Sequence, residues 1–320
     1  MQYRRLGNAG IKVSEISLGS YFGYGSVVDK QVAFDTIHRA YDLGVNFFDS
    51  ADCYDDHAAE KVLGEALSGY DRGSYVLATK VFYPMGEGPN DRGLSRKHIT
   101  ESIDRSLRAL GTDYVDIYYC HRYDTEAPLD ETLRALDDLV RRGKVLYVGI
   151  SEWAPGQIEE ALGLADKLLL DRLVVDQLQY SLLNRAIEEK GGVLEVARKH
   201  RLGLVAFQPL AQGFLTGKYK SLSDFPQGSR MTKSEINKHI KRYFNQETLD
   251  RVNTLPAMAA ELGITPAHLA LAWVLRKDAV ASALVGASRP AQIEENVKAS
   301  GVSLPGDVLA KLDDVFTETV

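Results

Sequence analysis

The chain has 320 residues, of which 45% are hydrophobic and 26% are charged, which suffices for one large core or two modest ones. A net charge of −6 and the lack of a basic run argue against a nucleic-acid partner. The start, Met1 to Leu6, lacks the apolar stretch of a signal peptide, and no apolar segment approaches the roughly 20 residues of a membrane span. Only Cys53 and Cys120 are present, which suits a reducing compartment, and we expect both to be small buried hydrophobes. We therefore expect a cytoplasmic chain without membrane insertion.

Short β-branched or aromatic runs alternate with helical patterns along the sequence. A small hairpin comes first, with residues 3–6 turning through residues 7–10 into residues 11–13. The strands predicted after it end at Ser20, Asp49, Lys80, Cys120, Ile150, Gln177, Phe207 and Val285. The helices predicted between and after them span residues 31–43, 58–67, 96–110 behind the N-cap Ser95, 129–142, 154–167, 188–200, about 246–262, 266–276 and 290–299.

Eight such units without a Pro/Gly/Ser-rich linker predict one α/β domain over residues 1–320, a (β/α)8 TIM barrel. The N-terminal β-hairpin could plug the barrel floor, and the polar stretch of residues 215–245 is an insertion after the seventh strand. A doubly wound sheet is the rival fold, but it should carry Gly-x-Gly-x-x-Gly after its first strand. The nearest match, Gly23-Tyr24-Gly25, lacks the third glycine.

Four polar residues fall at or just past the ends of predicted strands. Asp49, Lys80 and His121 close three of these runs, and Tyr54 lies on the loop after Asp49. In a β/α barrel the carboxyl ends of the strands converge on one mouth, where catalytic residues gather. Each residue alone also admits a structural role, as a cap, a loop aromatic, a rim lysine or a core histidine. Together they predict one catalytic cluster.

These four side chains suit the polarisation of a carbonyl group. A phenol has a reference pKa of about 10, and a nearby cation that favours phenolate makes it a better acid. We expect Lys80 to lower the pKa of Tyr54 in this way, and Asp49 to keep the lysine charged. His121 can hydrogen-bond the substrate oxygen.

Other chemistries match the sequence less well. Residues 149–153 begin like a hydrolase nucleophile elbow, but Trp153 replaces the last glycine. His57 and Glu60 lack further ligands at metal-binding spacing, so we expect no metal site. Residues 286–290 suit an anion site at a helix start, with Arg289 as a further contact. Ordinary helix entry with Ser288 as the cap is the equal alternative.

The ordered motifs resemble those of the aldo-keto reductases along essentially the whole chain. The matching residues are Phe48-Asp49-Ser50-Ala51-x-x-Tyr54, Ala78-Thr79-Lys80, Asp113 to Asp116 with His121-Arg122, Val148 to Ser151, Gln177 to Leu183 with Arg185, Pro209 to Lys218, and Gly286-Ala287-Ser288 with Glu295-Asn296. The passage from Gly93 to Ile99 is most similar to the branch that contains potassium-channel β-subunits and their bacterial relatives.

The resemblance implies NADPH, more than NADH, lying across the barrel mouth without a Rossmann fold. It implies reduction of small aldehydes or ketones, with Asp49, Tyr54, Lys80 and His121 as catalytic residues and Tyr54 as proton donor. Tyr21, Tyr54, Tyr83 and His121 would bind the substrate. The implied cofactor-binding residues are Ser20, Tyr21, Asp49, Ser151, Glu152, Gln177, Phe207, Gln208, Pro209, Leu210, Ala211, Gln212, Gly213, Lys218, Arg230, Gly286, Ser288, Arg289, Gln292, Glu295 and Asn296.

Three residues depart from the family pattern: Glu152 replaces a common Asn, Phe207 a Tyr or Trp, and Gln208 a Ser. Two other functions stay open, an NADP-binding regulatory or interaction subunit with little turnover and a polyol dehydrogenase working in the oxidative direction. The channel subunits commonly carry Asn at the position of His121, so the histidine favours a working reductase. The branch also implies a homo-oligomer.

Overall fold

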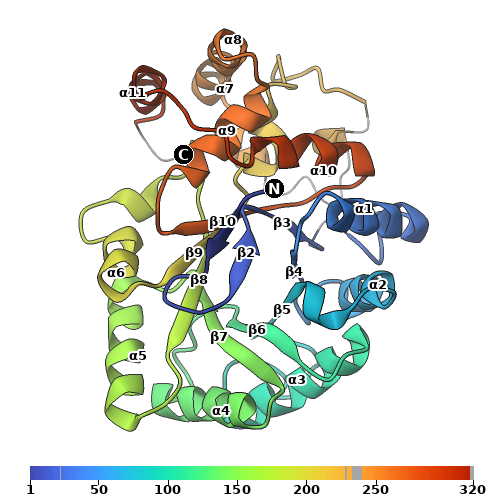
Figure 1. Ribbon diagram of the computed structural model, residues 1–320, viewed down its shortest axis with the longest axis vertical. Helices are drawn as coiled ribbons and strands as arrows, with labels where there is room; N and C mark the ends of the chain where they lie inside the picture. The colour runs from blue at the N-terminus through green and yellow to red at the C-terminus, as the bar shows by residue number, and fades with distance from the viewer. Residues whose placement is uncertain (22, 228, 233–239, 318–320) are drawn as a thin grey trace.

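The computed structural model describes residues 1–317 apart from residues 22, 228 and 233–239, and it leaves the side chain of residue 230 undescribed. Its centre is a closed barrel of eight parallel strands in the order β10-β3-β4-β5-β6-β7-β8-β9 (Figure 1). The strands are β3 (Ile16–Gly19), β4 (Phe47–Asp49), β5 (Val76–Val81), β6 (Val115–Cys120), β7 (Val145–Ser151), β8 (Leu173–Gln179), β9 (Gly203–Phe207) and β10 (Val280–Val285). The predicted TIM barrel is confirmed.

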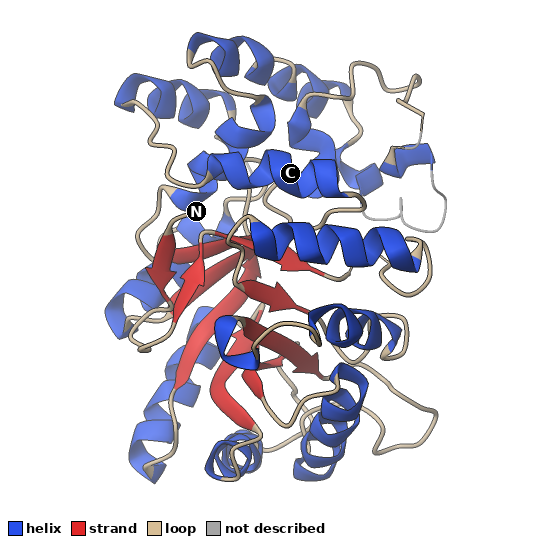
Figure 2. Ribbon diagram, turned by 45° about the vertical axis from the view of Figure 1, so that its right-hand side comes forward, coloured by secondary structure: helices blue, strands red, loops and turns tan. Residues whose placement is uncertain are grey.

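Helices lie around this barrel, as Figure 2 shows. They are α1 (Lys30–Asp42), α2 (Ala58–Leu67), α3 (Arg96–Leu110), α4 (Leu129–Arg141), α5 (Pro155–Leu168), α6 (Val193–His200), α7 (Gln246–Val252), α8 (Leu255–Glu261), α9 (Pro266–Leu275), α10 (Pro290–Asn296) and α11 (Gly306–Val315). Helix α3 shows why boundaries could be predicted. The Ser95 hydroxyl accepts a hydrogen bond from the His98 amide, and Gly111 ends the helix in the left-handed region at φ 66°.

The structure departs from the predicted helices in several places, including residues 297–299, which form a 3-10 turn after α10 (Pro290–Asn296). Helix α6 starts at Val193 instead of residue 188, because residues 186–188 form a separate 3-10 turn. The helix expected over residues 246–262 is two helices, since Pro256 lacks an amide hydrogen and is tolerated only in the first turn of α8. Helix α11 was not predicted at all. It lies near α7 and α8 in Figure 1.

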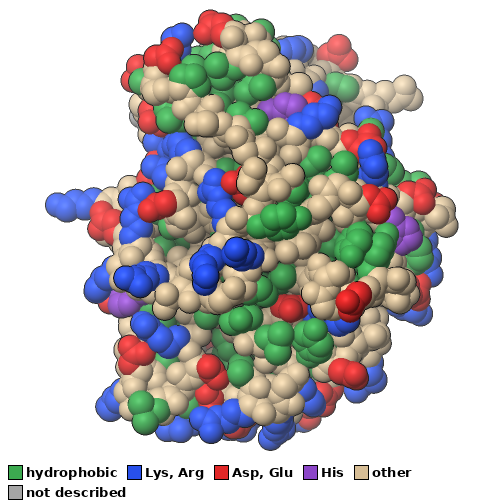
Figure 3. Space-filling view, viewed as in Figure 1, with side chains coloured by type: hydrophobic (Ala, Val, Ile, Leu, Met, Phe, Trp, Pro, Cys, Tyr) green, Lys and Arg blue, Asp and Glu red, His purple; other side chains and the backbone are tan. Residues whose placement is uncertain are grey.

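The polar insertion after β9 contains only short helical turns in its described part, at Ala211–Thr216, Arg230–Thr232 and Ile240–Tyr243. None of the described helices is by itself long and apolar enough to cross a membrane, although the bent pair of segments 246–261 and 266–275 jointly meets the criteria of length and composition. On the face seen in Figure 3, acidic and basic side chains are intermixed.

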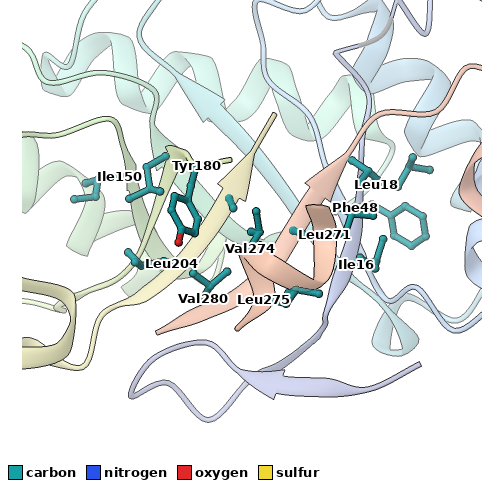
Figure 4. Packing of buried hydrophobic residues seen from close by; sticks show 14 of the residues in the cluster. Ile16, Leu18, Phe48, Ile150, Tyr180, Leu204, Leu271, Val274, Leu275 and Val280 are labelled. Carbon is teal, nitrogen blue, oxygen red and sulfur yellow. The ribbon is translucent and has the colours of Figure 1, made fainter. Parts of the chain in front are cut away.

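Apolar side chains fill the space inside the barrel and the layer between barrel and helices. Figure 4 shows the second layer, where Leu271, Val274 and Leu275 of α9 pack near Leu204 and Val280 of the strands. The removal of these apolar side chains from water is the main force that holds the helices on the barrel.

The N-terminal hairpin, β1 (Tyr3–Arg5) and β2 (Lys12–Ser14), closes the floor of the barrel. Leu6 and Val13 are fully buried in the cluster that fills the barrel interior. Arg4 donates hydrogen bonds to the carbonyls of Leu275 and Val280, at 2.6 and 2.9 Å. The hairpin is thus bonded to the end of α9 and to the start of β10.

Gly7 is the point of closest approach in this floor. It adopts φ +58°, and a Cβ atom there would lie 2.4 Å from the amide nitrogen of Gly203. We predict that Gly7→Ala lowers the free energy of unfolding by about 2 to 4 kcal/mol, from backbone strain and overlap with a rigid backbone. Denaturant unfolding measures this. Gly10→Ala is the control, because a Cβ at Gly10 meets nothing within 4 Å. Equal stability of the two variants would contradict the prediction.

Candidate active site

A cavity of about 800 Å³ opens where the carboxyl ends of the strands converge. Its wall contains residues that end or follow each of the eight barrel strands, including Tyr83 after β5. This is the mouth at which the sequence placed the four polar residues.

The structure brings those four residues together. Lys80 is fully buried on β5, and its Nζ donates to the Asp49 carboxylate, to the Ser50 carbonyl at 2.6 Å and to the Tyr54 hydroxyl at 3.3 Å. The second Asp49 oxygen accepts from Gln177 Nε2 at 2.8 Å. The His121 ring lies edge-on to Tyr54, with ring centroids 5.8 Å apart. Asp49, Tyr54 and His121 reach the cavity wall, and Lys80 lies behind it.

The lysine determines how the tyrosine can hydrogen-bond. An ammonium group has three N–H donors and no acceptor, and Lys80 uses all three on Asp49, Ser50 and Tyr54. The Tyr54 oxygen therefore accepts from Lys80, and its own O–H hydrogen must point to a different partner. Since Tyr54 forms part of the cavity wall, a molecule in the cavity can be that partner.

The expected lowering of the Tyr54 pKa is not found. Burial is the largest effect and raises the pKa of Tyr54 well above its usual value, and the Asp49 charge raises it further. The reason is that Lys80 is already paired with Asp49, so the ion pair offers the phenol little net positive charge. Tyr54 is thus held as a neutral phenol. It retains its proton until an oxygen that develops negative charge can take it.

His121 is held neutral for a related reason. Burial, followed by the nearby charges of Lys80 and Arg122, lowers its pKa well below the usual value. Its Nδ1 lies 3.8 Å from the sulfur of Cys53. Burial raises the pKa of Cys53 to about 12, so this cysteine is a thiol that can donate to Nδ1. That contact favours the tautomer in which Nε2 carries the hydrogen.

The two cysteines differ in their environment. Cys120 is fully buried, which matches the small hydrophobe predicted for both, whereas Cys53 is only half-buried and forms part of the cavity wall. The prediction for Cys53 is therefore incomplete.

Two aromatic side chains predicted to contact substrate flank the same cluster. The ring of Tyr21 lies 5.0 Å from that of Tyr54, and Tyr83 lies 4.9 Å from His121, both edge-on. Tyr21 is 53% exposed, so it stands at the cavity rim.

Most residues proposed for the cofactor line the same cavity. Those on its wall are Tyr21, Asp49, Ser151, Glu152, Gln177, Phe207, Gln208, Pro209, Leu210, Gln212, Gly213, Lys218, Gly286, Ser288, Arg289, Gln292, Glu295 and Asn296. Ser20 and Ala211 do not reach it: Ser20 is buried and donates to the Ser50 hydroxyl at 2.9 Å, and Ala211 is fully buried. The Arg230 side chain lies outside the described part of the chain.

The three departures from the family pattern have distinct local settings. Glu152 adopts φ 59°, and its carboxylate accepts from the Gln179 amide at 2.6 Å. Gln208 adopts φ 53°, and its side-chain oxygen accepts from Arg242 at 3.5 Å. Phe207 ends β9 on the cavity wall. The Glu152 carboxylate is thus held by the backbone at the end of β8.

At the far end of the cavity, Ser288 is not the helix cap that the alternative interpretation required. The residue before α10 is Arg289, and the amide of Ser288 donates to Gln292 Oε1 at 2.7 Å. Arg289 is exposed and stands on the cavity wall.

Several wall residues were not predicted, including Val27, Val28, Cys53, Arg122, Gln179, Thr216, Arg242 and Leu284. Arg122 had a signal, because it follows β6 directly after His121. Arg242 had none, since it comes from the long insertion whose path the sequence does not indicate. Within the residues that the structure describes, no group of three or more His, Cys, Asp or Glu side chains could hold a metal ion.

Comparison with known proteins places the chain in a family. The model described as "Aldo/keto reductase family" matches residues 15–316. The chain belongs to the aldo/keto reductase family. It is therefore an oxidoreductase, and the family uses nicotinamide cofactors, generally NADPH.

Named relatives of this aldo/keto reductase fall into two groups. It is 41% identical to a probable voltage-gated potassium channel subunit beta from Arabidopsis thaliana, over 99% of this chain and 97% of the relative. A putative channel subunit beta from Schizosaccharomyces pombe is 39% identical, over 99% and 94%. L-glyceraldehyde 3-phosphate reductase from Escherichia coli K12 is 37% identical, over 98% and 92%.

A buried acid beside the site gives a prediction on stability. Asp52 is fully buried, one oxygen accepts from the Cys53 amide at 2.7 Å, and the other has no partner in the described residues. Burial, and then the charge of Glu60, raises the pKa of Asp52 to about 7.

Because the folded pKa is raised, the unfolded chain releases this proton first as the pH rises, and stability falls between about pH 4 and pH 7. Asp52→Asn removes that loss, because Asn does not ionise. We predict that the unfolding free energy of the variant, relative to that of the wild type, increases by roughly 2 to 3 kcal/mol from pH 4.5 to pH 8. Denaturant unfolding at the two pH values measures the gain. A stability difference independent of pH would contradict it.

Proposed function

We propose that this protein is an NADPH-dependent reductase of small aldehydes or ketones, with Tyr54 as the proton donor. The main support is the orientation of Tyr54: Lys80 occupies a lone pair of its oxygen and leaves its O–H available at the cavity wall. A reductase needs such a donor, because the carbonyl oxygen gains a proton as the carbon gains a hydride.

The residues present fit a dinucleotide cofactor. When bound, a reduced nicotinamide supplies the hydride. Ser151 and Gln177 would hold its carboxamide and Phe207 its ring, and Lys218 and Arg289 offer cations for phosphates. All five lie on the wall of one continuous cavity. Gln177 donates to Asp49, which leaves its carbonyl oxygen free to accept from an amide.

The chain's own groups then act on the carbonyl oxygen. The Tyr54 O–H and the Nε2 hydrogen of His121 donate to this oxygen and polarise the bond. As hydride adds to the carbon, the oxygen becomes an alkoxide and takes the Tyr54 proton, which yields the alcohol. The Lys80 ammonium already donates to the phenolic oxygen, so it stabilises the phenolate that remains.

Removing the proton donor tests this mechanism. We predict that Tyr54→Phe lowers kcat by about 10² to 10⁴-fold, the usual range for loss of a general acid, with NADPH affinity little changed. Steady-state NADPH oxidation and fluorescence titration measure the two quantities. Tyr70→Phe is the control, since Tyr70 packs against Tyr41 away from the cavity wall. Undiminished turnover in Tyr54→Phe would refute the assignment.

The choice of cofactor gives a second prediction. Arg289 is exposed at the end of the cavity where the adenosine 2′-phosphate would lie, so Arg289→Ala should weaken NADPH binding about 10- to 100-fold and NADH binding far less. Titration with both cofactors measures the ratio. Arg198→Ala on α6, which is paired with Asp278, is the control. Equal loss for both cofactors would show that Arg289 does not select the phosphate.

An interaction subunit with little turnover is the second candidate, because relatives at 39 to 41% identity are named as channel subunits. Such a protein would bind NADPH without reducing any carbonyl. A third candidate is the oxidation of a polyol with NADP⁺, which would use the same four residues in reverse. Assays of carbonyl reduction and of alcohol oxidation distinguish this function from that of a reductase. Self-association is proposed on the family resemblance alone, and a cytoplasmic location on the composition of the sequence.

A further inference from the structure

Arg122 places an uncompensated positive charge beside the cluster of Tyr54 and His121. Its Nη1 donates to the His121 carbonyl at 2.6 Å and approaches the Ser151 hydroxyl at 3.5 Å. The guanidinium carbon lies 5.8 Å from the centre of the Tyr83 ring. Among the described residues Arg122 forms no ion pair, although it forms part of the cavity wall.

The nearest acids do not neutralise this charge by contact. The Glu152 carboxylate accepts from the Gln179 amide. Asp176 is fully buried, and burial, with the charge of Glu152, raises its pKa well above the usual value, which favours its neutral form. A half-buried guanidinium loses hydration without regaining a paired anion, which makes its site receptive to one.

The position of Arg122 separates it from the cations assigned to the cofactor phosphates. Arg122 follows β6, and Arg289 follows β10, which stands opposite β6 in the eight-membered barrel. Lys218 belongs to the segment that follows β9, next to β10. The cavity thus has cations at two opposite sides, and only the side of Arg122 also carries Tyr54, Tyr83 and His121.

We infer that Arg122 binds an anionic group of the substrate, so that the favoured substrates are short aldehydes bearing a phosphate or a carboxylate. This inference rests on the proposed reductase function. The anion would lie beside Tyr83 while the carbonyl oxygen meets Tyr54 and His121. The anchored Nη1 holds the guanidinium plane in place and leaves Nε and Nη2 without a bond in the described chain.

Matched substrate pairs test the inference. NADPH oxidation is measured with glyceraldehyde 3-phosphate against glyceraldehyde, and with succinic semialdehyde against butanal. For the wild type we expect kcat/KM about 10- to 100-fold higher for at least one anion than for its neutral partner. Preference for the phosphate, the carboxylate or both identifies the anionic group. In Arg122→Met the preference should disappear, mainly through KM, and Arg122→Lys should restore part of it.

Arg198→Met is the matched control, because Arg198 lies on α6 and pairs with Asp278 outside the cavity. Its charge preference should equal that of the wild type. Turnover of neutral and anionic aldehydes at equal kcat/KM would overturn the inference and leave the proposed function standing. Equal losses for both substrate types in Arg122→Met would also overturn it, because Arg122 would then act only through the His121 carbonyl.

A binding measurement keeps the test decisive if no carbonyl is reduced, the outcome that contradicts the proposed function. The NADP⁺-loaded protein is titrated calorimetrically with glycerol 3-phosphate and with glycerol, and with succinate and butanediol. At least 10-fold tighter binding of an anion, lost in Arg122→Met, supports the anion site independently of turnover. Equal affinity for anion and neutral ligand overturns it.

Discussion

The buried ammonium of Lys80 is the interaction on which the rest of the site depends. A charge without solvent exposure is costly unless every donor is paired, and here the three partners, Asp49, Ser50 and Tyr54, come from the end of β4 and the loop that follows it. The strands β4 and β5 are neighbours in register, with Asp49 opposite Ala78. This pairing sets Asp49 and Ser50 beside Lys80, and the turn after Ala51 returns Tyr54 to it. The buried ammonium therefore fixes the start of the loop through Asp49 and Ser50, and the direction of the phenolic hydrogen through its bond to Tyr54.

The barrel was predictable because its signals are local and repeated. Boundaries are indicated within a few residues by the strand runs and, for α3, by the N-cap Ser95 and the helix-ending Gly111. Eight repeats of strand and helix are compatible with few topologies other than a barrel. The failures lie where tertiary packing decides. Only Val308 and Leu312 are buried within helix α11, so its position depends on contacts such as the bond from Arg185 to the Phe316 carbonyl. Pro256 indicates a helix start before α8, but the apolar residues on both sides of it favoured one continuous helix.

The candidate site divides in the same way. That Asp49, Tyr54, Lys80 and His121 meet follows from strand ends, which are sequence features. The electrostatics do not follow, because the pKa of Tyr54 depends on burial and on the neutralisation of Lys80 by Asp49. Ser20 had a strand-end position similar to that of Asp49, yet it lies behind the wall and bonds to Ser50. A position at a strand end thus does not by itself decide whether a side chain points into the cavity or away from it, because successive side chains of a strand point to opposite faces.

Under the proposed function, the placement of cations around the mouth would let one cavity hold a cofactor and a substrate on opposite sides. A cofactor anchored by cations beside β9 and β10 would leave the side of β6 to the substrate, and Arg122 would provide a separate attraction there. Because the two cationic regions stand on opposite sides of the barrel, the proposed anionic substrate would be drawn toward Arg122, where its carbonyl would approach Tyr54. A neutral aldehyde would lack that second anchor, and its carbonyl would be held only by the hydrogen bonds from Tyr54 and His121. The neutral aldehyde would then be reduced by the same chemistry but would be less well oriented. Arg122 would therefore select among substrates without changing the reaction.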